Sequence, residues 1–458
     1  MGGKMKKLKK AFLAGRLITA FACPLFAAYN SWGIPDSSEI RKGLSERWFE
    51  ASLDAVRMNL PEIFDNDAGQ KFQVRLEESD STYMIYVAPC AVINVKVYSS
   101  KGVSYDQQEV YPGDAPGSWV LVRDKKTDAP IRIRWYFSTD SDIYIQFTPY
   151  GKTALADMVI YGNYASKGAS TGIPFKSLYE VSFQDVLDMT ALSLPWKYVT
   201  VDSDKYGSVL QMAGMIQKNL GRVMFVSDAM YNEDNELVQI TNGKPFNTDN
   251  IDSGKLYLSS AGFLKWIADG LVEPIAGTKL KRAPLLVETV SVKDNGYQGV
   301  LSQKYNLFFG LDWIRNLASA VLSVTTGKVY MYNESGADVT INPFAATISN
   351  AGTMNTVTFI EDTGYNAAVL KSLLYVLCAT EPGNVYFGAI RETDKTVTPE
   401  IKVFNDCVMF LPYFSNGSFG CFVYMNGRQI SLDDFCMIYS DAYVYLTRVR
   451  ASDNFYPD

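Results

Sequence analysis

The sequence predicts a multidomain α+β protein in which an N-terminal antiparallel β-sandwich precedes a larger α+β domain. Hydrophobic residues recur at every second position between about residues 68 and 163, which is the period of half-buried strands. From about residue 172 the apolar spacing becomes mixed, and strand-like segments dominate from about 384 to 449. Helices followed by a sheet indicate an α+β arrangement. A chain of 458 residues has room for two or three domains of about 150 residues each.

Residues 1–28 have the composition of a secretory signal peptide. Five of the first ten residues are lysines, and a short apolar run follows that ends at Ala28. Arg16 limits this run to fewer than the ~20 residues that a bilayer-spanning helix needs. We therefore expect the segment to be removed on export, after Ala22 or after Ala28, and the protein to act in the periplasm or cell envelope. Cys23, directly after Ala22, also permits lipoprotein processing and a lipid anchor.

Net charge and hydropathy narrow the range of partners. Removing the six basic residues of the signal segment leaves 37 of the 43 basic residues against 49 acidic ones, a net charge of −12. A chain this acidic, without a basic tract, is not expected to bind nucleic acid or an anionic lipid surface. No second long apolar run follows, so we expect no transmembrane segment in the mature chain.

Cofactor and metal sites are not expected from the motifs. Neither of the phosphate-binding glycine patterns, GxGxxG and GxxxxGK[ST], occurs. No two cysteines form a CxxC pair, which disfavours a zinc site. Cys407, Cys421 and Cys436 lie close together in sequence, and an exported protein could oxidise one pair. Buried free thiols are the commoner state for such residues.

The region before the α+β domain divides into two predicted parts. Apolar residues recur at helical spacing from Phe49 to Leu60, which predicts a helix over residues 37–63 that ends near Pro61. Short alternating runs separated by turn clusters predict the β-sandwich over 68–163, of roughly immunoglobulin size. In an exported protein such a module binds a partner or acts as a spacer.

Residues 172–458 form the predicted α+β domain. Apolar residues at helical spacing indicate four helices, which span about 209–220, 260–269, 307–317 and 370–377. Gly221 and Gly270 mark the expected ends of the first two helices.

Three short segments of this domain follow one another in an informative order. They are Ser259-Ser260-Ala261-Gly262-Phe263 at the start of an apolar helix, then Glu381-Pro382-Gly383-Asn384, then Asn405-Asp406-Cys407 in a late strand. This order resembles the NlpC-type cell-wall peptidases of the papain-like superfamily. In that family a Cys-Ser-Gly-Phe segment opens the nucleophile helix, a Pro-Gly-Asp strand follows, and the next strand carries the catalytic histidine. The resemblance covers about residues 200–450 and implies a papain-like domain with an insertion around 272–378.

Matched position by position, the resemblance assigns the nucleophile position to Ser260 and the histidine position to Asn405, within a residue or two. Asn384 stands for the aspartate of Pro-Gly-Asp, and Asn426 on the next strand for the polar residue that orients the histidine. A cysteine nucleophile at a helix N-terminus needs a neighbouring imidazole as its base. Here a hydroxyl replaces the thiol, and the chain contains no histidine.

These departures predict a catalytically degenerate domain, a pseudoenzyme that binds a cell-wall (peptidoglycan) peptide or an envelope protein in the former substrate groove. An alternative is a structural or adhesion-type envelope protein in which the β-sandwich carries the binding. A third interpretation keeps hydrolysis through Ser260. Its base would be Lys265, which lies five residues along the helix and is rotated off the face of Ser260. Ser260 could instead cap the helix, since a serine oxygen accepts hydrogen bonds from the first N–H groups.

Overall fold

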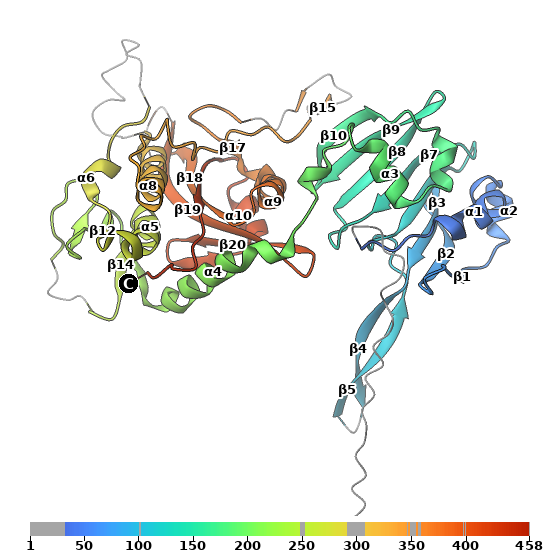
Figure 1. Cartoon of the computed structure of the whole chain (residues 1–458), viewed down its shortest axis with the longest axis horizontal. Coiled ribbons are helices and arrows are strands. Elements are labelled where there is room, and N and C mark those ends of the chain that lie inside the picture. The colour runs from blue at the N-terminus through green and yellow to red at the C-terminus, as the bar shows by residue number, and fades with distance from the viewer. Residues whose placement is uncertain are drawn as a thin grey trace, which may run out of the picture.

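The computed structural model describes residues 33–99, 102–247, 252–290, 307–345, 347–348, 354–355, 359–396, 398 and 400–457. The fold is a mixed α+β structure built on two large antiparallel sheets, one in each half of the chain (Figure 1). The expected signal segment 1–28, with Cys23, lies outside the described residues, as does part of the expected insertion around 272–378. No helix of the described part is long and apolar enough to cross a membrane.

Three short helical segments lead into the first sheet. They are α1 (Ser38–Leu44), the π-helical turn η1 (Ser45–Phe49) and α2 (Leu53–Arg57). The helix predicted over 37–63 is therefore interrupted, because Ser52 adopts an extended backbone where α2 begins. The end of that range belongs to strand β1 (Glu62–Asp65).

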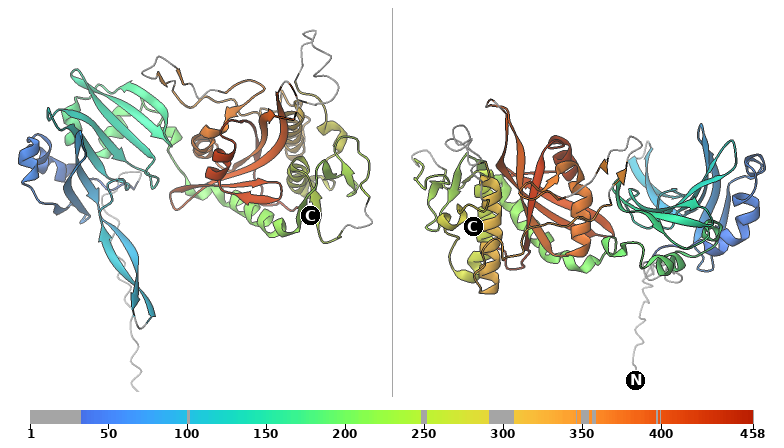
Figure 2. Two further views of the ribbon diagram at one scale, coloured as in Figure 1. Left: turned by 180° about the vertical axis from the view of Figure 1, so that it is seen from behind. Right: turned by 90° about the horizontal axis from the view of Figure 1, so that it is seen from above.

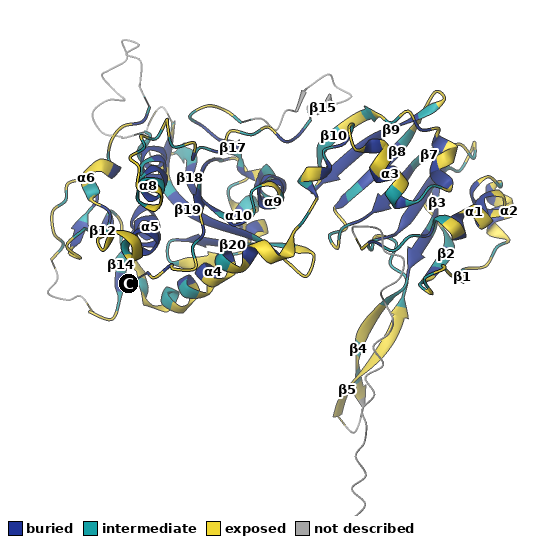
Figure 3. Cartoon of the chain, in the orientation of Figure 1, coloured by how far each residue is buried: buried dark blue, intermediate teal, exposed yellow. Residues whose placement is uncertain are grey.

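The N-terminal sheet is an antiparallel meander of eight strands in the order β1-β2-β3-β6-β7-β8-β9-β10. After β1 they are β2 (Lys71–Glu78), β3 (Thr82–Pro89), β6 (Trp119–Asp124), β7 (Pro130–Tyr136), β8 (Ile143–Tyr150), β9 (Thr153–Ile160) and β10 (Asn163–Ser170). All eight belong to one sheet, which differs from the two packed sheets of the predicted sandwich. Alternation along the strands gives one fully apolar face, and helices cover it in place of a second sheet (Figure 3). These helices are α1, η1, α2, η2 (Phe175–Tyr179) and α3 (Phe183–Thr190).

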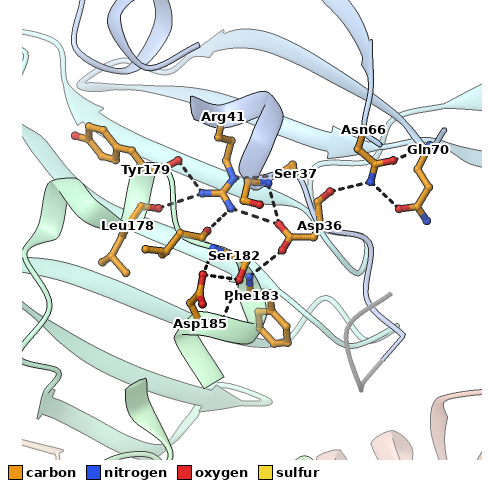
Figure 4. Close-up of polar contacts among 12 residues, drawn as sticks. Asp36, Ser37, Arg41, Asn66, Gln70, Leu178, Tyr179, Ser182, Phe183 and Asp185 are labelled. Atoms are coloured by element: carbon orange, nitrogen blue, oxygen red, sulfur yellow. Dashed lines mark hydrogen bonds and ion pairs between the residues drawn. The ribbon is translucent and has the colours of Figure 1, made fainter. Parts of the chain in front are cut away.

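A buried arginine ties these helices together (Figure 4). Arg41 of α1 has no exposed surface. Its guanidinium donates hydrogen bonds to the carbonyl oxygens of Leu178 (3.3 Å), Tyr179 (2.8 Å) and Val181 (2.6 Å). Its Nε donates to Ser37 Oγ at 3.0 Å, and the guanidinium lies 4.7 Å from the ring centre of Trp135. Burial lowers the pKa of Arg41 to about 10, and the charge of Asp36 opposes this shift.

Between β3 and β6 the chain leaves the sheet as a two-stranded hairpin, which we call the arm. Its strands are β4 (Ala91–Ser99) and β5 (Gly102–Val110), and they project away from the body (Figure 1). The strands pair with each other along their whole length, from Ala91 opposite Val110 to Ser99 opposite Gly102.

The second sheet has six antiparallel strands in the order β17-β22-β18-β19-β20-β21. In that order they span Tyr365–Asn366, Tyr443–Arg450, Asn384–Asp394, Ile401–Ser415, Ser418–Met425 and Arg428–Ile430. Helices cover both faces (Figure 2). The helices α4 (Gly207–Asn219), α5 (Ser260–Ala276) and α8 (Phe309–Thr326) pack on one face, and α9 (Leu370–Thr380) and α10 (Leu432–Ile438) on the other.

The four helices expected in this half correspond to α4, α5, α8 and α9. Gly270 does not end α5, which continues to Ala276. A Cβ at Gly270 would lie 2.8 Å from the ring of Phe455, so this glycine allows the C-terminal segment to approach the helix.

Smaller elements flank α5: β11 (Val223–Phe225) pairs with β14 (Leu256–Leu258), and β12 (Ala229–Tyr231) with β13 (Leu237–Gln239). Further short segments are η3 (Trp196–Tyr198), η4 (Ser203–Tyr206), η5 (Leu220–Arg222), α6 (Arg282–Leu285), β15 (Thr347–Ile348), β16 (Met354–Asn355) and η6 (Ala367–Val369).

The two halves meet through α9. Asn163 of β10 donates a hydrogen bond from Nδ2 to Ser372 Oγ at 2.9 Å, and the rings of Tyr161 and Tyr375 meet edge to face at 5.7 Å. The apolar cluster beneath the first sheet continues into the α9 face of the second sheet.

Candidate functional site

The N-terminus of α5 is held by Ser259, not by Ser260. Ser259 has an extended backbone, and its Oγ accepts a hydrogen bond from the Gly262 N–H at 3.1 Å. The same hydroxyl donates to the carbonyl oxygen of Ala229 at 3.0 Å. Ser259 therefore caps the helix instead of Ser260, and the hydroxyl of Ser260 is available to a different partner.

The glycine and the aromatic residue of the motif have packing roles. A Cβ at Gly262 would lie 2.1 Å from the carbonyl oxygen of Ala229, so only glycine lets the end of α5 lie this close to β12. Phe263 is buried in the core between α5 and the sheet. Trp313 of α8 donates from Nε1 to the carbonyl oxygen of Ala261 at 2.9 Å, which fixes the first turn from the opposite side.

Ser260 faces β19, the strand that contains Asn405. Its Oγ donates a hydrogen bond to Asp406 Oδ1 at 3.0 Å. The pairing of β18 with β19 shifts here, since Ile390 lies opposite Asp406 while Arg391 lies opposite Phe404. Asn405 is the extra residue of this bulge, and it is exposed. Ser260 therefore contacts Asp406, one residue beyond Asn405, because the bulge turns Asn405 away.

Burial and like charges shape the electrostatics of this site. Burial raises the pKa of Asp406, and the hydrogen bond from Ser260 opposes that shift. Burial also raises the pKa of Glu392 on β18, and the charges of Asp406 and Asp394 raise it further. Burial raises the pKa of Tyr439 to about 12, with contributions from Asp406 and Glu392. Among the described ion pairs, neither Asp406 nor Glu392 has a cationic partner.

Asn426 lies in the turn after β20 rather than on a strand. Asn426 and Gly427 both have positive φ, 52° and 69°, as an Asn-Gly hairpin turn requires. The Oδ1 atom of Asn426 is buried and has no hydrogen-bond partner in the described structure. With Phe225, Met425 and Tyr439, Asn426 lines a cavity of about 360 Å³. No hydrogen bond joins it to Ser260 or Asp406 in the described residues, so the expected orienting contact is not formed.

Lys265 is engaged elsewhere. Its Nζ lies 2.7 Å from Asp269 Oδ2, and both side chains are buried. The other oxygen of Asp269 accepts the backbone N–H of Leu280 at 2.8 Å. This pair stabilises the start of the segment after α5, and Lys265 does not serve Ser260 as a base.

The Pro382-Gly383-Asn384 segment makes a turn at the far end of β18. Gly383 has a φ of +81°, and Arg450 donates from Nη1 to the carbonyl oxygen of Pro382 at 2.6 Å. Asn384 opens β18 opposite Arg450, whereas Asp406 lies opposite Ile390, near the other end. The segment does not reach Ser260.

The described cysteines Cys90, Cys378, Cys407, Cys421 and Cys436 are all free thiols. No disulfide joins the late cysteines, and burial raises the pKa of Cys407 and Cys421. In the described ranges, no group of three acidic or cysteine side chains could hold a metal ion.

Asp406 lies one residue beyond Asn405 and so within the range given for that position, whereas the sequence did not single out Glu392 or Tyr439. The available signal for Asp406 was its place in β19, where the polar pair Asn405-Asp406 interrupts an apolar strand. Glu392 and Tyr439 carry no such signal, since both come from strand or helix ends where polar residues are common. Chemically, the site offers the hydroxyl of Ser260 and the carboxyl of Asp406, with the carboxyl of Glu392 close enough for its pKa to be raised by the charge of Asp406.

Comparison with known proteins covers only the N-terminal half. The model of a family described as a domain of unknown function (DUF8515) matches residues 30–198, which include the first sheet, its helices and the arm. No curated protein and no solved structure matches the chain. The Ser260–Asp406 site lies outside the matched residues.

Proposed function

We propose that this is an exported cell-envelope protein whose C-terminal half is a papain-like domain that binds a peptide or protein partner without hydrolysing it. The observation that carries the proposal is the hydrogen bond from Ser260 Oγ to Asp406 Oδ1 at 3.0 Å. This bond joins a helix N-terminus to a neighbouring strand, which is also how the nucleophile and the base of the papain-like peptidases are placed. Here a hydroxyl replaces the thiol, and a carboxyl replaces the imidazole.

The chemistry of the two groups argues against turnover. A serine hydroxyl is a weak nucleophile unless a base removes its proton, and the chain contains no histidine, the side chain whose pKa suits that role near neutral pH. Losing the general base alone forfeits a factor of about 10²–10⁴ in rate. Lys265 could not compensate, because its ammonium is paired with Asp269.

The same groups favour a ligand that donates hydrogen bonds. Asp406 and Glu392 are partly buried acceptors without a cationic partner among the described ion pairs. Buried acceptors cost free energy unless a donor reaches them. A peptide with a free amino group, such as a cell-wall stem peptide, supplies both the cation and the amide donors.

Binding measurements with matched variants test this function. We expect the full chain to bind cell-wall peptides in calorimetry and Asp406→Asn to weaken binding by about tenfold, the worth of one charge-assisted contact. Asn405→Ala, next to Asp406 but turned away from the site, serves as the control and should bind as the unaltered protein does. Equal weakening by both variants, or no binding of peptides with free amines, would contradict the proposal.

Export has its own test. Mass spectrometry of the envelope fraction should find a chain that begins after Ala22, with a lipid on Cys23, or after Ala28. An intact Met1 on the protein in its native host would contradict export.

The structural or adhesion-type alternative has separate support in the first half of the chain. The arm exposes apolar side chains on a hairpin that contacts little of the body (Figure 3). Replacing residues 91–110 by a short turn should abolish attachment to a surface or partner if the N-terminal half carries the binding, and should leave peptide binding at Ser260–Asp406 intact.

A further inference from the structure

The arm carries an unusual amount of exposed apolar surface for so small an element. Val92, Ile93 and Tyr98 of β4 are 60, 44 and 73 % exposed, and Val103 and Tyr105 of β5 are 52 and 67 % exposed. A two-stranded hairpin is at best marginally stable in water by itself. Covering these side chains would therefore stabilise the arm as well as any complex that it forms.

The outer edge of β4 pairs with no other strand in the described residues, because β4 pairs only with β5. Exposed edge strands are usually protected by several charges, a proline or a bulge. β4 has none of these protections except Lys96, and its register with β5 is regular throughout. An edge of this kind is suited to pair with another strand.

The side chains of β4 separate into two rows. Ala91, Ile93, Val95 and Val97 lie on one face, and Val92, Asn94, Lys96 and Tyr98 lie on the other, because side chains alternate along a strand. Val95 is the middle residue of the nine-residue strand. Antiparallel pairing of β4 with itself about Val95 would therefore engage the whole strand.

We propose that the β4 edge pairs with the β4 edge of a second copy of this chain, antiparallel and centred on Val95. Two arms would then form one four-stranded sheet with a two-fold axis at Val95. On one face, Val95 would lie opposite the partner's Val95, and Ile93 opposite the partner's Val97. On the other face, Val92 would lie opposite the partner's Tyr98, and Asn94 opposite the partner's Lys96.

This register brings apolar side chains opposite apolar ones and places no like charges opposite each other. Each exposed apolar side chain of β4 gains an apolar neighbour across the strands, and the Val92–Tyr98 pair is of the β-branched–aromatic kind that stabilises sheets. Lys96 would lie opposite the side-chain amide of the partner's Asn94 rather than opposite a second lysine. The other edge fails the same test, because the middle residue of β5 is Asp106, and self-pairing there would place two carboxylates opposite each other.

Cysteine cross-linking of the full chain tests the register. In Val95→Cys the two introduced thiols would lie opposite each other at the axis. We expect this variant to form a covalent dimer under mild oxidation at least about tenfold faster than Ser104→Cys, since pairing holds its thiols at high effective concentration. Ser104 lies on the same face as Val95 but on β5, so it controls for exposure of the face. The unaltered protein gives the background from Cys90. Equal rates for the two variants would overturn the proposal.

Sedimentation gives the second measurement. We expect the unaltered chain to dimerise, and Val95→Glu to raise the dimer dissociation constant at least about tenfold, because it places two carboxylates opposite each other in an apolar row. Asn94→Glu should lower the constant, since each new carboxylate would face the partner's Lys96, and Ser104→Glu should leave it unchanged. The melting of the body, followed by circular dichroism, should be the same in all variants. A chain that stays monomeric, or an equal effect of Val95→Glu and Ser104→Glu, would overturn the proposal.

Discussion

The two antiparallel sheets differ in how their faces are covered. The second sheet has helices on both faces, so β19 is buried from Cys407 to Pro412 and almost every residue there is apolar. The first sheet has helices on one face only. Its other face carries Arg132 and Arg134 on β7, and Arg134 lies 4.8 Å from the ring centre of Tyr144.

This difference determines where a polar residue is informative. On β7, an arginine at every second position follows from the alternation of a strand whose other face is covered by helices, so the spacing by itself indicates no site. On β19, Asn405 is exposed on the bulge, whereas Asp406 is partly buried and accepts a hydrogen bond from Ser260 at the N-terminus of α5, so Asp406 is the informative residue of the two. On the arm, which has no covering layer, the informative residues are the apolar ones.

The largest effect should come from the arginine that anchors the helical layer of the first sheet. Arg41→Ala leaves the carbonyl oxygens of Leu178, Tyr179 and Val181 without their donor, and we expect a loss of about 3–5 kcal/mol in the free energy of unfolding. Urea unfolding measures it. Arg57→Ala removes a half-exposed ion pair with Glu78, which water and salt screen, and should cost far less than Arg41→Ala does. Similar losses in the two variants would mean that the layer is not held by Arg41.

A smaller effect is expected where α5 meets β12. Gly262→Ala places a Cβ against the carbonyl oxygen of Ala229, so the helix end must move, at a cost of about 1–3 kcal/mol. Peptide binding should weaken with it, because Ser260 moves away from Asp406. Gly214→Ala in α4 is the matched control, since no atom lies within 4 Å of its Cβ position, and it should stabilise the chain by about 0.5–1 kcal/mol. Unchanged stability and binding in Gly262→Ala would contradict the assigned contact.

Several features could be predicted from the sequence because they depend on local pattern. The period-two pattern indicated strands across 68–163 but did not separate the arm strands β4 and β5 from those of the first sheet, whereas the helical spacing located α4, α5, α8 and α9. The layer that packs on a sheet is not determined by the local sequence of its strands. Apolar and polar residues alternate in the same way whether helices or a second sheet cover the apolar face. The position of Asp406 depends on a bulge between β18 and β19, and a one-residue shift of this kind leaves no mark in the strand's own composition.

The smallest effect should be the pH dependence contributed by Asp406. Burial raises its folded-state pKa above the unfolded value of about 3.9, so its contribution is full below that value and is lost as pH rises through the folded pKa. The unaltered chain should therefore lose stability relative to Asp406→Asn as pH increases from about 4. Glu392 adds to the difference in the same direction, since Asp406 is one cause of its raised pKa. Unfolding curves that run parallel across this pH range would show that Asp406 is not buried as described.

We interpret Asp406 on β19 as a site residue and the arginines on β7 as ordinary residues of an uncovered sheet face. This interpretation requires that Ser260 and Asp406 form a binding site without turnover. The most direct measurement is the hydrolysis of cell-wall peptides by the full chain beside Ser260→Ala, with product detected by mass spectrometry. We expect the two proteins to give the same amount of product as a blank, while the unaltered chain still binds the peptides. Hydrolysis by the unaltered chain that Ser260→Ala abolishes would contradict the account.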